Sequence, residues 1–317
     1  MLNRTTISLA ILALIVAGCN KQEKSKAETD DPIVFSFSVD GSPVSGLALD
    51  NNAAYREIEV NVNRDDLVWD IVSDKSWCQV LPGEHCGPGI FSFIVNANNS
   101  FDAREEATLT LVSGEEEYAS LEIAQGGADC LLAQRFFICP KDERSLELDV
   151  LVKRDKSVRF DCDEWVNVEE ISGLSMEDTM VYTIKIWGSD NGDESRYGLV
   201  TFYLDDDGDS EKSVFYLYQF GNDVNYDADG KILIPGGQEG ASISFKAPYP
   251  LVKEILCPDF ASCSVHRDRD QIATYMIEFE QNQTGAPREI AVSVILNDDN
   301  STSVALPAII QDTPSES

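Results

Sequence analysis

Histidine is scarce in this sequence, and so are the spacings that hold metals. His85 and His266 are the two histidines in 317 residues, and no C-x-x-C pair occurs. A Ser-His-Asp or Cys-His catalytic group needs a histidine beside its nucleophile, and structural zinc needs closely spaced Cys or His ligands. The abundant carboxylates give no reason to single out two as a hydrolytic pair. We therefore expect no catalytic residues, no metal site and no cofactor.

Basic residues are also few. Lys and Arg number 24 against 56 Asp and Glu, which gives a formal net charge of −32 at pH 7. A surface of this kind repels nucleic acid and anionic lipid headgroups, and it keeps a secreted protein soluble. The charge argues against a nucleic-acid partner, and it identifies no other partner.

Long apolar runs are missing except near the N-terminus. Residues 7–17 form an apolar segment behind Arg4 that is too short for a membrane span of roughly 20 residues but typical of a secretory signal. The sequence VAGC ending at Cys19 resembles the bacterial lipoprotein signal, in which cleavage leaves a lipidated cysteine. We predict a signal peptide at residues 1–18, a membrane anchor on Cys19 and a flexible polar tether at residues 19–31. The alternative is an ordinary signal peptide with a chance cysteine.

Seven cysteines remain after Cys19, and six of them form close pairs in the sequence. Outside the cytoplasm such pairs could be disulfides, with Cys162 left over. The alternative is that the cysteines are free and act as small hydrophobic residues. The pairs are Cys78 with Cys86, Cys130 with Cys139, and Cys257 with Cys263.

Three arginines recur at a constant interval. Arg104, Arg196 and Arg288 lie 92 residues apart, and each follows a polar stretch. Their position at strand entrances predicts a structural ion pair or carbonyl contact. An aromatic residue precedes each arginine, and we expect the two tryptophans among them in the core, like the buried tryptophan of immunoglobulin domains. The aromatic residues are Trp77, Trp165 and Phe260, and the units end in Gln125, Gln219 and Gln311.

The segments around these arginines alternate as β-strands do. Residues 288–296 read REIAVSVIL and residues 199–204 read LVTFYL, with apolar side chains at every second position. The first repeat, ATLTLV, is out of phase by one residue, which a β-bulge or a tighter turn would explain. Repeats of about 93 residues with many short strands predict an all-β chain of tandem immunoglobulin-like β-sandwich domains. The predicted boundaries are residues 32–127, 128–221 and 222–313.

An acidic run, DDDGD at residues 205–209, lies between two of the predicted strands. It occupies the place of SGEEE and NDDNS in the other repeats, so we predict the tip of a hairpin. Its glycine is the fourth residue, whereas a calcium-binding EF-hand needs glycine at the sixth position and glutamate at the twelfth. Weak calcium binding is the alternative.

The first repeat resembles a known family. Residues 69–80 (WDIVSDKSWCQV) and residues 98–127 look like a BACON domain, the Bacteroidetes-associated carbohydrate-binding, often N-terminal module. The second and third repeats resemble it more loosely, because the second lacks the first tryptophan and the third has a phenylalanine at the second. The residues that match the family pattern in the first repeat are Trp69, Trp77, Arg104 and Gln125.

The resemblance implies an immunoglobulin-like fold on a cell-surface lipoprotein of the outer membrane of a carbohydrate-degrading bacterium. It also implies binding of a glycan or mucin, as an accessory to polysaccharide utilisation with outer-membrane uptake partners. Modules of this family can also serve as spacers. A structural stalk or a protein-binding adhesin without glycan affinity is therefore the alternative function.

A glycan-binding surface usually presents aromatic faces beside hydrogen-bonding groups. The strand phase of the second repeat sets Tyr216 and Tyr218 apart from the core-type residues, and a hairpin would bring Tyr203 near them on one outward face. Trp187 shares a face with Lys185 and is a further exposed candidate. We predict ligand binding by Trp187, Tyr203, Tyr216 and Tyr218. The alternatives are a cross-strand aromatic ladder and cover by a neighbouring domain.

Overall fold

The computed structural model describes residues 32–142, 144–154, 156–204, 211–237, 241–267 and 271–314. The predicted signal peptide, Cys19, the tether and the acidic run at residues 205–209 lie outside the described residues. The described part of the chain consists of short strands and one 3-10 turn, η2 (Tyr249–Leu251). Within that part, no helix is long and apolar enough to cross a membrane.

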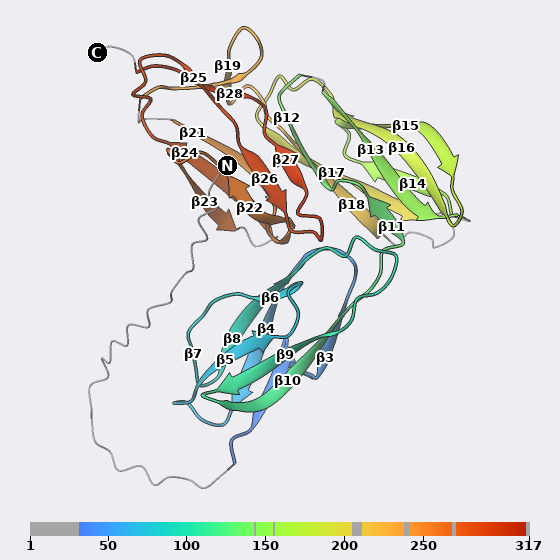
Figure 1. The fold of residues 1–317 in the computed structure, drawn as a ribbon, viewed down its shortest axis with the longest axis vertical. Coiled ribbons are helices and arrows are strands. Elements are labelled where there is room, and N and C mark those ends of the chain that lie inside the picture. Colours follow the sequence, from blue (N-terminus) through green and yellow to red (C-terminus); the bar gives the residue numbers. More distant parts are fainter. Residues whose placement is uncertain are drawn as a thin grey trace, which may run out of the picture. The chain divides into compact units, whose positions relative to one another are not determined.

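The first set of strands forms two five-stranded sheets that enclose a core (Figure 1). The strand orders are β2-β1-β4-β8-β6 and β3-β10-β9-β5-β7. Successive side chains of a strand point to opposite faces, so alternate residues such as Phe91, Phe93 and Leu109 are fully buried. The strands are β1 (Phe35–Val39), β2 (Ser42–Val44), β3 (Gly46–Leu49), β4 (Ala54–Val62), β5 (Val68–Ser73), β6 (Cys78–Val80), β7 (His85–Cys86), β8 (Gly89–Val95), β9 (Ala107–Ser113) and β10 (Glu116–Gln125).

The second set of strands forms two four-stranded sheets. Their orders are β11-β13-β16-β15 and β12-β18-β17-β14. Val150, Ile186, Phe202 and Phe215 are fully buried in the core of this set. The strands are β11 (Cys130–Leu132), β12 (Phe136–Cys139), β13 (Ser145–Lys153), β14 (Val158–Cys162), β15 (Val166–Ser175), β16 (Thr179–Gly188), β17 (Arg196–Leu204) and β18 (Glu211–Gln219).

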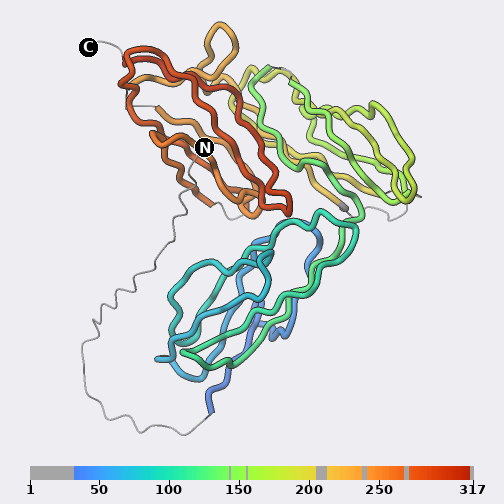
Figure 2. The backbone as a smooth tube through the Cα atoms, in the orientation of Figure 1, coloured from blue at the N-terminus to red at the C-terminus, as the bar shows by residue number. Residues whose placement is uncertain are grey.

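The third set of strands forms three smaller sheets. Their orders are β19-β20-β28-β25, β21-β24-β23 and β22-β26-β27. Figure 2 shows that each of these sets is one continuous stretch of chain. The strands are β19 (Asn225–Tyr226), β20 (Ile232–Ile234), β21 (Ser242–Pro248), β22 (Val252–Leu256), β23 (Ala261–Arg267), β24 (Ile272–Phe279), β25 (Arg288–Ile290), β26 (Ser293–Leu296), β27 (Ser303–Ala305) and β28 (Ile309–Gln311).

The alternation predicted from the sequence is confirmed. Ile290, Val292, Val294 and Leu296 are all buried. The one-residue phase difference in the first repeat begins before the hairpin, because Arg104 lies three residues ahead of β9 whereas Arg196 and Arg288 are the first residues of β17 and β25. The β9–β10 hairpin closes through a short turn in which Gly114 has a φ of 65°, and its register shifts between Glu117 and Ala119.

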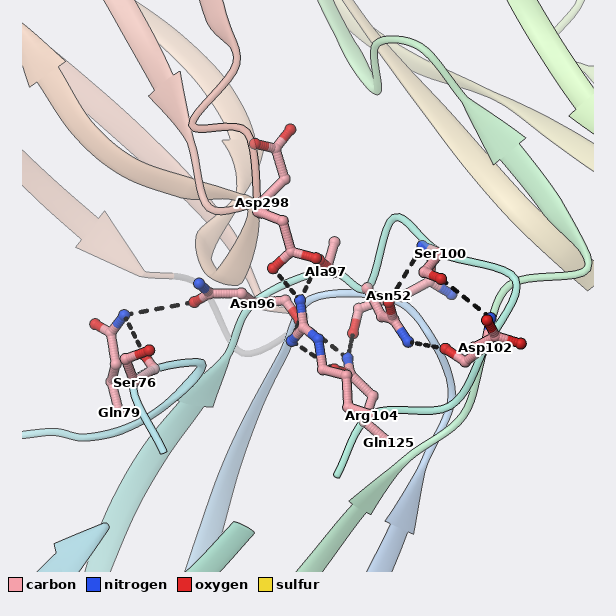
Figure 3. Close-up of polar contacts among 12 residues, drawn as sticks. Asn52, Ser76, Gln79, Asn96, Ala97, Ser100, Asp102, Arg104, Gln125 and Asp298 are labelled. Atoms are coloured by element: carbon pink, nitrogen blue, oxygen red, sulfur yellow. Dashed lines mark hydrogen bonds and ion pairs between the residues drawn. The ribbon is translucent and has the colours of Figure 1, made fainter. Parts of the chain in front are cut away.

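The recurrent arginine closes one end of the first sandwich (Figure 3). Arg104 donates from Nη1 to Oε1 of Gln125 at 2.8 Å and to the carbonyl of Asn96 at 3.2 Å. Its Nη2 donates to the carbonyl of Ala97 at 3.0 Å, and the guanidinium lies 5.2 Å from the ring centre of Trp77. The predicted carbonyl contact is confirmed, and we call this arrangement the arginine–glutamine network.

The same network recurs in the other two sets of strands. Arg196 donates from Nε and Nη2 to Oε1 of Gln219, at 3.0 and 2.7 Å, and its guanidinium lies 4.2 Å from the ring centre of Trp165. The recurrent aromatic residue is partly buried at the margin of the core, stacked on the arginine, rather than at its centre as we expected. In the third set, Arg288 Nε lies 2.8 Å from Gln311 Oε1 and its guanidinium 3.6 Å from the ring centre of Phe260.

The cysteines from Cys78 onward are free, so the disulfide alternative is wrong. Cys78, Cys130 and Cys139, which we call the buried thiols, are in the cores. Burial raises the pKa of each of these three thiols to about 12, because the thiolate would lose its hydration. The alternative, in which cysteines act as small hydrophobic residues, describes these three positions.

Candidate functional site

Tyr218 does not lie on an open surface. Only 5% of the residue is exposed, and its hydroxyl donates to the carbonyl of Ser244 at 3.3 Å. The centre of its ring lies 6.4 Å from that of Phe245, and the two ring planes meet at 67°. The face of β18 that carries Tyr218 contributes to an apolar cluster with β21 and β24 of the third set. The predicted outward exposure of Tyr218 is therefore wrong, because both faces of this strand are covered.

Tyr203 and Tyr216 lie at different places on the same hairpin. Tyr216 pairs with Leu199 and stacks on Tyr197, with ring centres 6.1 Å apart. Tyr203 pairs with Glu211 near the opposite end of the hairpin. The guanidinium of Arg159 lies 4.3 Å from the ring centre of Tyr203. The structure therefore does not bring Tyr203 beside Tyr216 and Tyr218, and the predicted three-tyrosine surface is not formed.

Trp187 is placed differently, on the outward face of the sheet β11-β13-β16-β15. Its neighbours along β16, Ile184 and Ile186, point into the core and are buried. Trp187 and Lys185 take the alternate positions and are partly exposed, with Lys185 Nζ 5.3 Å from the ring centre. The indole is thus held against a sheet, with part of its surface open to solvent.

The strands on either side of β16 place polar side chains around this indole. Ser145 of β13 and Asn167 of β15 are both paired with Trp187. One rung further along, Glu147 and Glu169 are both paired with Lys185. Ser145, Glu147 and Glu169 are exposed, and Asn167 Nδ2 donates to the Ser189 hydroxyl at 3.1 Å. We call Ser145, Glu147, Asn167, Glu169, Lys185 and Trp187 the Trp187 face.

The Trp187 face has the chemistry of a sugar-binding surface. An indole can stack on the apolar side of a pyranose, and carboxylate, amide, hydroxyl and ammonium groups can bond to its hydroxyls. Neighbouring strands of a sheet lie about 4.8 Å apart, so side chains from three strands can contact one sugar ring. In the described part of the chain, no group of three or more His, Cys, Asp or Glu side chains is placed to hold a metal ion.

The flanking residues of this face were missed in the sequence. SLELDVLVK and VNVEE carry the alternation that separates Ser145, Glu147, Asn167 and Glu169 from the core-facing residues. Alternation alone does not give the register between strands, and the register decides which polar residue stands beside Trp187.

The paired sheets define the class of the protein, a chain of tandem immunoglobulin-like β-sandwiches. An I-band fragment of titin is similar in structure at 9% identity, over 91% of this chain and 100% of the fragment, with a TM-score of 0.23. The N-terminal eight immunoglobulin domains of Down syndrome cell adhesion molecule match at 10% identity, over 89% of this chain and 35% of theirs, with a TM-score of 0.29.

A Bacteroides ovatus xyloglucanase in complex with a heptasaccharide is also similar. It is 19% identical over 33% of this chain, with a TM-score of 0.25, and the match spans 21% of the enzyme. No curated protein matches this chain.

Part of the first sandwich matches a known family. Residues 67–125 match the BACON family, which carries the description "Putative binding domain, N-terminal". The match runs from the start of β5 to the end of β10. The first repeat is therefore similar to a BACON domain over residues 67–125, the repeat in which the sequence predicted that resemblance.

Proposed function

We propose that this protein is a non-catalytic surface lipoprotein that binds glycans. The observation that carries the proposal is the Trp187 face, where a partly exposed indole is flanked in register by Ser145 and Asn167. Glu147 and Glu169 lie one rung further along, beside Lys185. The binding description of the BACON domain supports a binding role for the chain. The family resemblance supports carbohydrate as the ligand and polysaccharide utilisation as the setting.

The second and third sandwiches are proposed as further BACON-like units. The support is the arginine–glutamine network, which joins an arginine, a glutamine and an aromatic ring in the same way at all three positions. Each arginine guanidinium lies over its ring, 3.6 to 5.2 Å from the ring centre. A shared network of this kind fits repetition of one ancestral unit.

Anchoring at the outer membrane is part of the proposal and has a separate test. Lipidation of Cys19 followed by a polar tether would hold the sandwiches at the membrane surface. In the native host, Cys19→Ser should move the protein from the membrane fraction to the soluble fraction. Protease added to intact cells should degrade the wild-type protein if it faces outward. Membrane retention of the variant would contradict the anchor.

A structural stalk is the second candidate, and the burial of Tyr218 favours it. Aromatic side chains that fill the contact between successive sandwiches stiffen a chain instead of binding ligands. Tyr218, Phe220 and Phe245 form such a cluster. This candidate predicts a folded protein without affinity for any glycan.

Binding of the soluble chain, residues 20–317, to polysaccharides separates the two candidates. The probes are neutral plant polysaccharides, acidic polysaccharides and mucin O-glycans, measured by calorimetry after an array screen. We expect a neutral glycan to bind, because Glu147 and Glu169 repel anionic ones. Trp187→Ala should weaken binding about tenfold, since a stacked aromatic contributes about 1 kcal/mol or more beyond its burial.

The matched control is Tyr203→Ala. Tyr203 is also a partly exposed aromatic residue of the second sandwich that stacks with a cation, but it belongs to the other sheet. Its removal should leave glycan binding unchanged. No binding by the folded wild-type chain would favour the stalk, and equal loss in both variants would contradict a site on the Trp187 face.

A further inference from the structure

One edge of the second sandwich is formed by β14 and β15, and the opposite edge by the short strands β11 and β12. β14 and β15 are the last strands of their sheets, they follow one another in the chain, and neither has a second partner among the described strands. The corresponding edge strands of the first sandwich, β6 and β7, have only 3 and 2 residues. β15 has 10 residues. Proteins usually keep edge strands short or charged because an unpaired edge pairs with other chains, so a long open edge calls for an explanation.

This edge also exposes apolar side chains. Leu174 is 62% exposed, Met176 53%, Ile171 50% and Phe160 of β14 37%. All the residues from Glu169 to Glu177 are exposed, so both faces of the strand are accessible along this stretch. An edge that offers free backbone groups and apolar anchors together has the two features of a strand-addition site.

The hydrogen-bonding pattern shows which backbone groups are available. Met176 donates to the carbonyl of Thr179 at 2.8 Å, which closes the β15–β16 hairpin. In an antiparallel ladder, bonded and non-bonded pairs alternate. Ser175, paired with Met180, and Gly173, paired with Tyr182, are therefore the non-bonded pairs, whose N–H and C=O groups point away from β16. The regular stretch ends at a register shift between residues 170 and 172. We call residues 171–176, with Phe160, the β15 edge.

Acidic residues outnumber basic ones around the β15 edge, where Arg154 donates to the carbonyl of Glu177 at 3.1 Å. Asp161, Glu169, Glu170, Glu177 and Asp178 are all exposed. A second copy of the chain would bring the same carboxylates into contact with these, and like charges on facing strands are destabilising. The complementary occupant is an extended segment that alternates apolar with basic residues.

We propose that the β15 edge binds an extended segment of another protein, rich in alternating apolar and basic residues, as an added strand. The free groups of Gly173 and Ser175 bond to the backbone of that segment. Leu174 and Met176 contact its apolar side chains, and the surrounding carboxylates contact its lysines or arginines. Binding of this segment at the β15 edge does not require that the protein also binds a glycan.

The test uses a ten-residue synthetic peptide that alternates valine with lysine, titrated into residues 20–317 at 0.15 M salt. The control peptide has the same sequence with alternate backbone amides methylated, which keeps its charge but removes donors on one edge. We expect the first peptide to bind at least tenfold more tightly than the methylated one. Equal binding of the two peptides would overturn the proposal, because attraction to the acidic surface alone predicts it.

Ser175→Pro and Ser175→Ala localise the site. Proline removes the outward N–H of Ser175 without removing a bond to β16, and proline is tolerated on edge strands. Ser175→Pro should weaken peptide binding roughly three- to tenfold, the effect of losing one backbone hydrogen bond. Ser175→Ala keeps the N–H and should bind like the wild type. If Ser175→Pro fails to fold, Leu174→Lys replaces it, and wild-type affinity in that variant would refute the site.

Discussion

Gln219 is the centre of the network in the second sandwich, and its replacement by leucine tests what that network contributes. The side chain is fully buried. Its Oε1 accepts two bonds from Arg196, and its Nε2 donates to the carbonyls of Lys141 and Ser189 at 3.1 and 3.0 Å. Leucine has a similar volume but removes all four bonds. The variant therefore isolates the polar contribution from the packing.

The expected loss follows from these bonds. Each hydrogen bond contributes about 0.5–1.5 kcal/mol net, and buried groups left without a partner cost about 1–3 kcal/mol. Arg196 keeps its bond to the carbonyl of Ser189 and its contact with Trp165, which limits the damage. We expect Gln219→Leu to lower the free energy of unfolding of the second sandwich by about 3 kcal/mol. The total free energy of unfolding of a domain of this size is roughly 5–13 kcal/mol.

Hydrogen exchange measured by mass spectrometry suits this test, because a chain of several sandwiches does not unfold in one step. Peptides from β17 and β18 should exchange faster in Gln219→Leu. Gln79→Leu is the control, since Gln79 is an exposed strand glutamine and its loss should change stability by less than about 0.5 kcal/mol. Arg196→Met should combine with Gln219→Leu less than additively, because both break the same bonds. A change below about 0.5 kcal/mol in Gln219→Leu would refute the reasoning.

Three further predictions concern pH, thiol reactivity and a close contact. The buried thiols ionise near pH 8.5 in the unfolded chain but only near pH 12 in the folded chain. Their contribution to the free energy of unfolding should therefore be fully present below about pH 8.5 and should be lost as the pH rises from there to about 12. Urea unfolding at several pH values measures this loss. Iodoacetamide at neutral pH should modify the exposed Cys86 before the buried thiols, and equal rates in peptide mapping would contradict their burial. Gly198→Ala should lower the free energy of unfolding by about 1–3 kcal/mol, because the added Cβ would lie 2.5 Å from the ring of Trp165. Gly192→Ala is the control: its Cβ meets no atom within 4 Å, so the same unfolding assay should show little effect.

The recurrent arginines show what a single sequence can predict about this fold. Their spacing and the glutamines that follow were enough to predict repeated sandwiches and carbonyl contacts for Arg104, Arg196 and Arg288. Apolar alternation predicted the buried faces, because a strand with one solvated face must place its apolar residues at every second position. The stacking of the aromatic ring on the arginine was not predicted, because a buried aromatic residue and one that stacks on a cation give the same pattern in the sequence.

The candidate site was harder to predict for a physical reason. Alternation separates Tyr218 from Phe215 and Leu217, but it does not show whether the second face meets water or another sandwich. The alternation within β16 was enough to predict that Trp187 and Lys185 share one face of the sheet. The partners of Trp187 on β13 and β15 depend on strand register, and for β15 this register includes the hairpin and the bulge at residues 170–172.

The apolar cluster shared by the second and third sets of strands constrains how this chain can be cut or recombined. Phe136, Ile138, Tyr218 and Phe220 are buried together with residues of β21 and β24. A fragment that ends near residue 221 would expose these four side chains to water, whereas residues 35–125 contain a separate core. Gene duplication and exchange could therefore move the first sandwich alone, but the second and third would be inherited as a pair.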